Sequence, residues 1–129
     1  MLKVLLITAI FGGFGAIARH YHSAGIEQRA RQRNQLLGPV GHGTLGVNLI
    51  GSFLAGLVLG FPLMPMTIKL MLLSFLSGYT TFSTAMVDVV KAWSMGERSL
   101  ALRYVYLMPL LCLLAVAFGF FLPIIFLAF

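Results

Sequence analysis

Four apolar segments of membrane-spanning length alternate with shorter polar segments along the chain. They cover approximately residues 3 to 23, 43 to 63, 66 to 90 and 102 to 127. Each segment is close to the roughly 20 residues with which an α-helix crosses the hydrocarbon core of a bilayer. The pattern predicts an all-α integral membrane protein, in which residues 1–129 form a single membrane domain with four transmembrane helices.

The third apolar segment contains polar residues that a merely spanning helix does not need. Between Ser77 and Thr84 it holds two serines, three threonines and a glycine, within the stretch SFLSGYTTFSTAMVD that begins at Ser74. Small hydroxyl side chains compete for backbone hydrogen bonds, and glycine weakens a helix further. Irregular backbone inside a membrane persists only where protein covers it or where it lines a cavity. The sequence therefore predicts a break in the third helix, at a permeation or binding site.

The second apolar segment carries a face of polar and small residues. Thr44, Asn48, Ser52, Gly56 and Gly60 recur at every fourth position, which places them on one side of a helix. The small residues suit close helix packing. An amide inside a membrane is costly unless it is paired, so Asn48 has two explanations that remain open: a hydrogen bond between helices, or donation to an anion.

The composition restricts the possible functions. Hydrophobic residues make up 60 % of the chain and charged residues 9 %, which excludes an ordinary soluble domain. The net charge is +6, but the basic residues lie between apolar segments, where they orient membrane proteins, and the sequence contains no nucleic-acid-binding motif. It also lacks paired carboxylates, metal-ligand clusters and nucleophile motifs. An enzyme is therefore not expected, and neutral donors along a passage suit an anion.

Residues at the ends of the apolar segments carry further expectations. The first segment ends near Arg19, whose side chain either reaches the lipid headgroups, the preferred alternative, or guards a polar cavity. Residues 24 to 42 are expected to form a solvated loop or a short surface helix. Asp88 is expected to pair with Lys91 at the membrane interface, and the alternative is an inward orientation.

Three motifs resemble those of a known family. They are GGFGAIARHY at residues 12 to 21, GTLGVNLIGSFLAG at 43 to 56 and SGYTTFSTAMVD at 77 to 88. In this order they resemble the small bacterial Fluc-type fluoride channels, and the resemblance covers essentially the whole chain. It implies an antiparallel, dual-topology homodimer with two fluoride pores in the bacterial inner membrane. The implied activity is passive, fluoride-selective export that relieves fluoride toxicity.

The resemblance also implies the residues of the site. The implied fluoride pore is formed by Asn48, Phe82, Thr81, Ser83, Thr84, Arg19 and Tyr104. In this arrangement Asn48 donates to the anion, and Phe82 presents the electropositive edge of its ring. Backbone carbonyls of Ser77 and Thr80 from both subunits would hold a structural sodium ion. No organic cofactor is implied.

The chain departs from the family pattern at four positions. Ala85 stands where the family commonly has a second phenylalanine, and Ser77 where relatives have glycine. Met108 and Cys112 stand where relatives often have serine. We expect that another side chain fills the space beside Ala85, because native interfaces rarely leave an apolar void. The candidates are Met86, Met108, Tyr104 and Tyr106. The channel is then expected to conduct more slowly than its relatives, and Ala85→Phe is expected to speed transport.

The distribution of charge leaves alternatives open. The N-terminal side and the turn at 61–69 carry Lys3 and Lys69, whereas the opposite loops carry Arg29, Arg31, Arg33, Lys91, Arg98 and Arg103. The positive-inside rule then puts both long loops in the cytoplasm and both termini outside. This imbalance favours one alternative, a fixed-orientation subunit of a heterodimeric fluoride channel that is opposed by a paralogous subunit. Ala85 and the loss of polar residues from the fourth helix favour another, a non-conducting subunit. A small four-helix multidrug exporter would need a membrane-embedded carboxylate in the first helix, which the sequence lacks.

Overall fold

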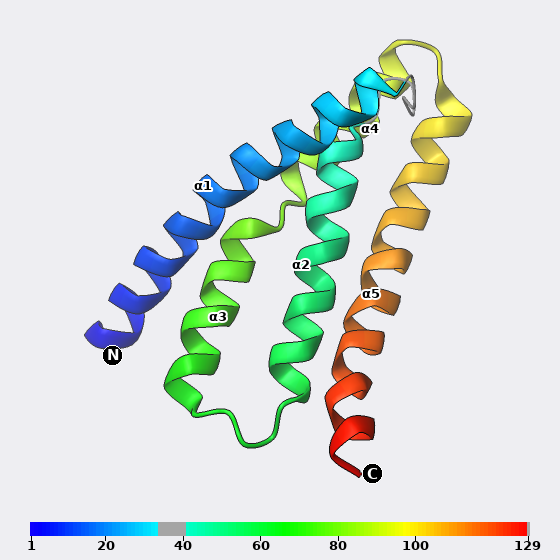
Figure 1. Cartoon of the computed structure of the whole chain (residues 1–129). Coiled ribbons are helices and arrows are strands. Elements are labelled where there is room, and N and C mark those ends of the chain that lie inside the picture. The colour runs from blue at the N-terminus through cyan, green and yellow to red at the C-terminus, as the bar shows by residue number, and fades with distance from the viewer. Residues whose placement is uncertain (34–40, 129) are drawn as a thin grey trace.

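All regular structure in the described part of the chain is helical. The computed structural model describes residues 1–33 and 41–128 (Figure 1). Its helices are α1 (Leu2–Gln32), α2 (His42–Gly60), α3 (Met66–Tyr79), α4 (Ser83–Ser94) and α5 (Arg98–Ala128). Helices α1, α2 and α5, and the stretch from α3 through α4, are each long and apolar enough to cross a membrane. The prediction of an all-α protein with four membrane-spanning stretches is confirmed.

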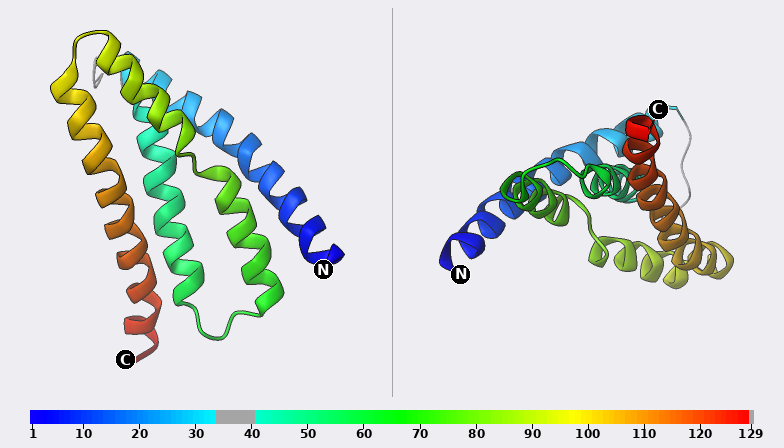
Figure 2. Two further views of the ribbon diagram at one scale, coloured as in Figure 1. Left: turned by 180° about the vertical axis from the view of Figure 1, so that it is seen from behind. Right: turned by 90° about the horizontal axis from the view of Figure 1, so that it is seen from below.

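The chain passes back and forth between two ends of the molecule. Figure 1 shows both termini at the same end as the α2–α3 turn, whereas the end of α1 and the α4–α5 turn lie at the opposite end. From behind, α1 and α5 flank α2 and α3 (Figure 2). Among the described helices, α2 is the one that contacts all of the others. Helix α2 is therefore the central element of the described chain.

Helix α1 is longer than the sequence predicted. The expected end near residue 23 was wrong, because the helix continues to Gln32. The extension contains good helix formers and no proline, and Glu27 pairs with Arg31 one turn further on, with 3.6 Å between Oε1 and Nε. The first part of the segment 24–42, expected to be a loop or a short surface helix, thus continues the first helix. The remainder, residues 34–40, lies outside the described residues.

The ends of α2 and α5 also differ from the expected positions. Helix α2 stops at Gly60 rather than near residue 63, because Phe61 precedes Pro62 and adopts an extended conformation that a following proline favours. Helix α5 begins at Arg98 rather than near residue 102. It follows Gly96 closely, where a φ of 86° reverses the chain at a conformation that glycine adopts without strain.

Glycines allow two pairs of helices to touch through their backbones. A Cβ atom added to Gly15 of α1 would overlap the carbonyl of Phe75 in α3, and one added to Gly56 of α2 would overlap the carbonyl of Val116 in α5. Lipid gives helices no hydrophobic reason to associate, so close backbone packing is a main source of their attraction. These contacts hold α3 against α1 and α5 against α2.

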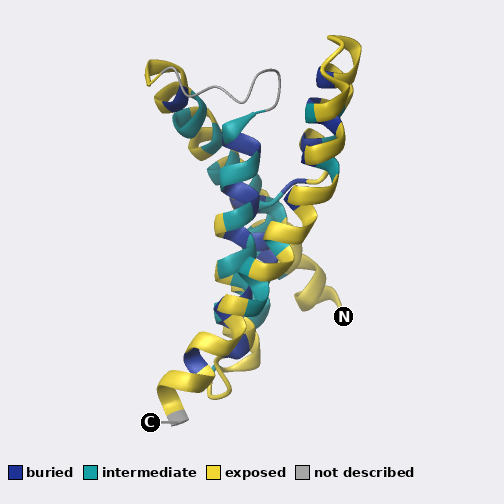
Figure 3. Ribbon diagram, turned by 90° about the vertical axis from the view of Figure 1, so that its right-hand side faces the viewer, coloured by how far each residue is buried: buried dark blue, intermediate teal, exposed yellow. Residues whose placement is uncertain are grey.

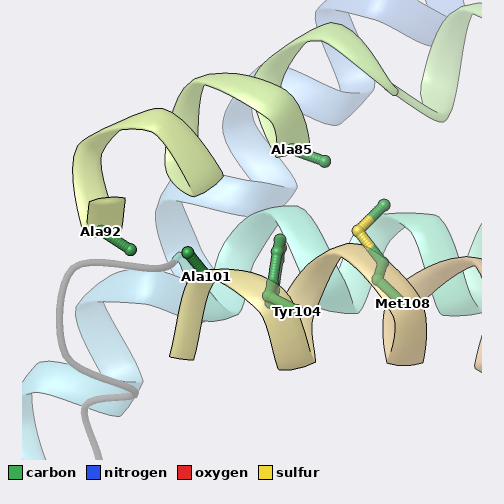
Figure 4. Close-up of a cluster of buried hydrophobic side chains, with 5 residues drawn as sticks. All are labelled: Ala85, Ala92, Ala101, Tyr104 and Met108. Carbon is green, nitrogen blue, oxygen red and sulfur yellow. The ribbon is translucent and has the colours of Figure 1, made fainter. Parts of the chain in front are cut away.

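Burial is concentrated in the interior of this single chain. Figure 3 shows buried residues along α2 and on one side of α4 and α5, while much of α1 and α5 is exposed. Between α4 and α5 lies an apolar cluster of Ala85, Ala92, Ala101, Tyr104 and Met108 (Figure 4). The exposed apolar surface of α1 and α5 suits contact with lipid or with another membrane chain.

Candidate functional site

The backbone changes conformation between α3 and α4. Helix α3 ends at Tyr79, and the Thr80 N–H makes a last helical hydrogen bond to the Leu76 carbonyl at 3.0 Å. Thr80 itself is extended, with φ −86° and ψ 160°, and α4 begins only at Ser83. Backbone groups in an apolar environment require hydrogen-bond partners, so residues 80–82 need partners from other elements.

Asn48, in the middle of α2, supplies two of these partners. Its Nδ2 donates to the Thr81 carbonyl at 2.8 Å, and its Oδ1 accepts from the Thr81 N–H at 2.7 Å. Asn48 is 3 % exposed and Thr81 8 %. The amide thus replaces two backbone hydrogen bonds, which accounts for a polar side chain inside an apolar helix. Of the two explanations left open for Asn48, a bond between helical elements is present in this geometry.

The Thr81 hydroxyl makes hydrogen bonds at the N-terminus of α4. Its Oγ1 accepts from the Thr84 N–H at 3.3 Å, and it lies 3.0 Å from the Thr84 hydroxyl and 3.3 Å from the Ser83 hydroxyl. Phe82 is the residue directly before α4, and the Thr81 hydroxyl, one position earlier, satisfies an N–H group of the first helical turn. Thr81 therefore has two separate roles: its main chain binds α2, and its side chain binds the first turn of α4.

Helix α1 makes hydrogen bonds to Tyr79 and Thr80, where α3 ends. Nη1 of Arg19 donates to the Thr80 carbonyl at 3.3 Å, so Arg19 turns inward instead of reaching the headgroups, which was the preferred expectation. His22 Nδ1 shares a hydrogen bond with the Tyr79 hydroxyl. His22 and Tyr79 were not among the residues predicted from the sequence. The signal that could have identified His22 is its three-residue spacing from Arg19, which places both residues on one face of α1.

A groove of about 220 Å³ lies beside the pair formed by Asn48 and Thr81. It is lined by Asn48, Ser52, Thr80, Thr81, Phe82, Met108, Pro109 and Cys112. Helices α2 and α5 and the segment between α3 and α4 thus all contribute to it. Phe82 is 65 % exposed, so its ring is available to a group outside this single chain. Four of the predicted residues, Asn48, Thr80, Thr81 and Phe82, line this groove together.

The other predicted residues lie around the groove and do not line it. Ser83 and Thr84 are exposed on the first turn of α4, and Ser77 is exposed on α3. Tyr104 belongs to the apolar cluster, and its hydroxyl is buried with no hydrogen-bond partner among the described residues. Ala85 is fully buried in the same cluster, which also contains Tyr104 and Met108 and against which Met86 packs, so three of the four candidates from the sequence lie there.

Two carboxylates meet the N-terminus of α2. Asp88 Oδ2 accepts from the Gly41 N–H, and Glu27 Oε2 accepts from the Gly43 N–H, each at 3.3 Å. Asp88 therefore takes the inward orientation and not the preferred pairing with Lys91. The unpaired N–H groups and the positive end of the helix dipole attract a carboxylate at this position. Both acids line a polar cavity of about 420 Å³.

Comparison with known proteins adds an independent line of information. The profile of the family described as "CrcB-like protein, Camphor Resistance (CrcB)" matches residues 6–120. A protein of Francisella tularensis subsp. mediasiatica named "Fluoride-specific ion channel FluC" is 30 % identical over 127 residues, which cover 92 % of each chain. One of the same name from Geobacter sulfurreducens is 36 % identical over 101 residues, covering 74 % of this chain and 77 % of the relative.

A third relative extends the comparison beyond these two organisms. The protein named "Fluoride-specific ion channel FluC 1" of Leifsonia xyli subsp. xyli is 39 % identical over 92 residues, which cover 68 % of this chain and 63 % of the relative. The four membrane-spanning stretches agree with a multi-pass membrane protein, and the relatives are named as channels and not as enzymes. The chain therefore belongs to the CrcB-like family of membrane proteins.

Proposed function

We propose that this chain forms the conducting pathway of a passive, fluoride-selective channel in the bacterial inner membrane. The names of its relatives support the proposal. The observation that carries it is the double hydrogen bond between Asn48 and Thr81, which holds a non-helical segment beside a groove. Irregular backbone at membrane depth is tolerated where it lines a cavity. In this proposal residues 80–82 form a break within the third membrane span.

The direction of transport follows from the chemistry of a weak acid. Fluoride enters a cell as the neutral acid and is trapped inside once the acid dissociates. A membrane potential that is negative inside then drives the anion out, by about 2.3 kcal/mol per charge for each 100 mV. A passive pathway is therefore sufficient to export fluoride and to relieve its toxicity.

Selectivity requires groups that replace the water around fluoride. Neutral donors and the positive edge of an aromatic ring can do this without trapping the ion. The groove offers the Asn48 amide, the Ser52 hydroxyl and the Phe82 ring. Arg19 lies outside the groove lining, bound to the Thr80 carbonyl, where its charge attracts an anion without occupying the path.

The pathway needs a second chain to cover it. Ser77, Phe82, Ser83 and Thr84 are exposed on the outside of this single chain around the break. Hydroxyl groups and irregular backbone are unfavourable against lipid, because lipid offers no hydrogen bonds. We propose that an antiparallel second chain covers this region, as a second copy in dual topology. The charge imbalance between the two ends favours a second candidate, an opposed paralogous subunit beside this chain as a fixed-orientation partner.

We also propose a structural sodium ion at the carbonyls of Ser77 and Thr80 from both chains. In a continuous helix the Thr81 N–H would bond to the Ser77 carbonyl, but here it bonds to Asn48, which leaves the Ser77 carbonyl available. The Thr80 carbonyl accepts from Arg19 and has a second lone pair. Replacing sodium by N-methylglucamine during purification is expected to weaken the dimer in size-exclusion chromatography. A dimer of unchanged stability would contradict the sodium site.

Fluoride efflux from liposomes, measured with a fluoride electrode, tests the proposed function. The purified wild-type protein is expected to release fluoride when valinomycin carries the compensating potassium, and to retain chloride. Asn48→Asp is expected to reduce efflux to the level of protein-free liposomes. A fixed negative charge repels the anion, and the Thr81 carbonyl loses its donor.

A matched control separates local from general effects of the added charge. Gln28→Glu adds an acid at an exposed position of α1, away from the groove, and is expected to conduct like the wild type. Size-exclusion chromatography verifies that each variant is folded. If folded Asn48→Asp conducts as fast as the wild type, Asn48 is not part of the pathway. If the wild type releases no fluoride, the chain is a non-conducting subunit.

A further inference from the structure

Two cavities meet at one side chain, Met108. On one side lies the groove that contains Asn48 and Ser52. On the other lies a second cavity, also of about 220 Å³, whose lining includes Leu45, Tyr104 and Met108 and is almost entirely apolar. Among the described residues, Met108 is the one that lines both. It is 5 % exposed and lies between the two spaces.

The sulfur atom of Met108 covers a hydrogen-bond donor of Asn48. Sδ lies 4.0 Å from Asn48 Nδ2, whose other hydrogen is donated to the Thr81 carbonyl. A thioether is a weak acceptor, so this contact satisfies the amide poorly compared with an oxygen or an anion. The second N–H of the Asn48 amide is thus directed toward the Met108 sulfur, which an incoming anion can displace.

A second donor lies beyond Met108. Tyr104, one helical turn earlier on α5, buries its hydroxyl without a hydrogen-bond partner among the described residues. A buried donor without a partner is energetically costly, and the Tyr104 hydroxyl retains an unused capacity to donate a hydrogen bond. In Figure 4 the side chains of Tyr104 and Met108 rise from the same side of α5 toward α4. Met108, which itself offers no donor, thus neighbours two residues that do, Tyr104 in the apolar cluster and Asn48 on α2.

We propose that Met108 is the rate- and selectivity-determining barrier of this channel. The inference rests on the proposed conduction of fluoride. In this proposal a dehydrated fluoride ion passes the Met108 thioether on its way between the Asn48 amide and the Tyr104 hydroxyl. An apolar constriction opposes an ion because it offers no groups that replace water. Methionine is unbranched and has three rotatable side-chain bonds, so it can move aside and return. Conduction is therefore slow, and it requires movement of this side chain.

Substitutions at Met108 test the barrier in the liposome efflux assay. Met108→Ser replaces the thioether by a small hydroxyl donor, and we expect fluoride efflux to rise about tenfold or more, with greater leakage of chloride through the widened space. Met108→Leu keeps the volume and the apolar character but adds branching, so we expect efflux slower than that of the wild type. Met95→Ser makes the same exchange at an exposed position next to α4 and is expected to conduct like the wild type.

The outcomes separate failure of the barrier from failure of the proposed function. If the wild type conducts and folded Met108→Ser conducts at the same rate, Met108 is not the barrier, while the channel function stands. If the wild type is nearly silent and Met108→Ser conducts, both proposals are supported. If neither conducts, in vesicles where a related fluoride channel does, both proposals are overturned. Thermal unfolding in detergent confirms that the serine variant is folded.

Discussion

Neighbouring residues at the interruption face opposite environments. Thr81 is buried against α2, whereas Phe82 is 65 % exposed. The cause is the extended backbone at Thr80, which breaks the helical repeat just before these residues. Thr81 therefore anchors the segment inside the chain, while the ring of Phe82 lies on the outer surface of the chain.

Ala85 carries a prediction at the residue scale. It is fully buried beside Tyr104, so the larger side chain of Ala85→Phe has no room. We expect this substitution to lower the free energy of unfolding by about 1–3 kcal/mol and to slow fluoride efflux. The packing thus reverses the expectation from the sequence that a phenylalanine here speeds transport. Thermal unfolding in detergent and efflux from liposomes measure the two effects.

The control for Ala85→Phe places the same ring elsewhere on α4. Val87 is 51 % exposed, so Val87→Phe adds an aromatic side chain without crowding the apolar cluster. We expect it to leave both stability and efflux close to those of the wild type. Faster efflux from Ala85→Phe, with stability retained, would show that position 85 faces the ion pathway and that the cluster opens in the membrane.

At the scale of elements, helix ends and helix contacts position the site. The N-terminus of α2 receives Asp88 from α4 and Glu27 from α1, which satisfy backbone N–H groups that a helix start leaves unpaired. In the middle of α2, Asn48 binds the segment between α3 and α4. Helix α2 is thereby attached to its neighbours at two levels, and the groove lies between rigid elements.

The contact between α1 and α3 carries a prediction at this scale. A Cβ atom at Gly15 would overlap the Phe75 carbonyl, and backbone cannot move aside as a side chain can. We expect Gly15→Ala to lower the free energy of unfolding by about 1–3 kcal/mol or to prevent folding. Gly13→Ala is the matched control, because a Cβ there meets nothing within 4 Å. We expect it to be neutral or stabilising by up to about 1 kcal/mol, since alanine favours a helix.

Size-exclusion chromatography and thermal unfolding in detergent distinguish these two variants. Equal stability of Gly15→Ala and Gly13→Ala would mean that α1 and α3 do not pack as closely in the membrane as they do in this structure. If only Gly15→Ala loses stability, the non-helical segment 80–82 should also shift, because Arg19 of α1 donates a hydrogen bond to the Thr80 carbonyl. Fluoride efflux should then fall together with stability.

At the scale of the whole molecule, the two ends differ in charge. Both termini and the α2–α3 turn lie at one end, and the end of α1 and the α4–α5 turn lie at the other (Figure 1). The first end carries Lys3 and Lys69, whereas the basic residues of the long loops belong to the second. Because positive charge is retained on the cytoplasmic side, the second end is expected inside the cell.

The orientation of the chain in the membrane can be tested with reporter fusions. If the charge difference sets the orientation, the C-terminus is outside, and we expect a C-terminal alkaline phosphatase fusion to be active and a C-terminal green fluorescent protein fusion to be dim. Adding lysines to the α2–α3 turn, as in Met64→Lys with Leu63→Lys, should shift molecules toward the opposite orientation. Equal activity of both reporters in the wild type would contradict a fixed orientation and would favour the dual-topology homodimer.

The sequence by itself determined the membrane class, the four spanning stretches and the family. Hydrophobicity over about 20 residues is enough to place a span, because the bilayer acts on each segment separately. The cluster of hydroxyl residues also located the region where α3 gives way to α4, since such residues disturb a helix locally. The end of α1 could not be predicted in this way, because its extension is polar and depends on helix-forming residues and not on lipid.

The tertiary structure alone decided which groups complete the site. Asn48 binds Thr81 across 33 positions of the chain, and Arg19 binds Thr80 across 61. No periodic pattern specifies such a pair, because it depends on how helices cross and on which glycines let them approach. The same is true of Tyr104, which shares a helix face with Met108 in the sequence but is buried with its hydroxyl unpaired. The residue types show which side chains can donate hydrogen bonds. Only the packing of the helices determines which of these donors already have a partner.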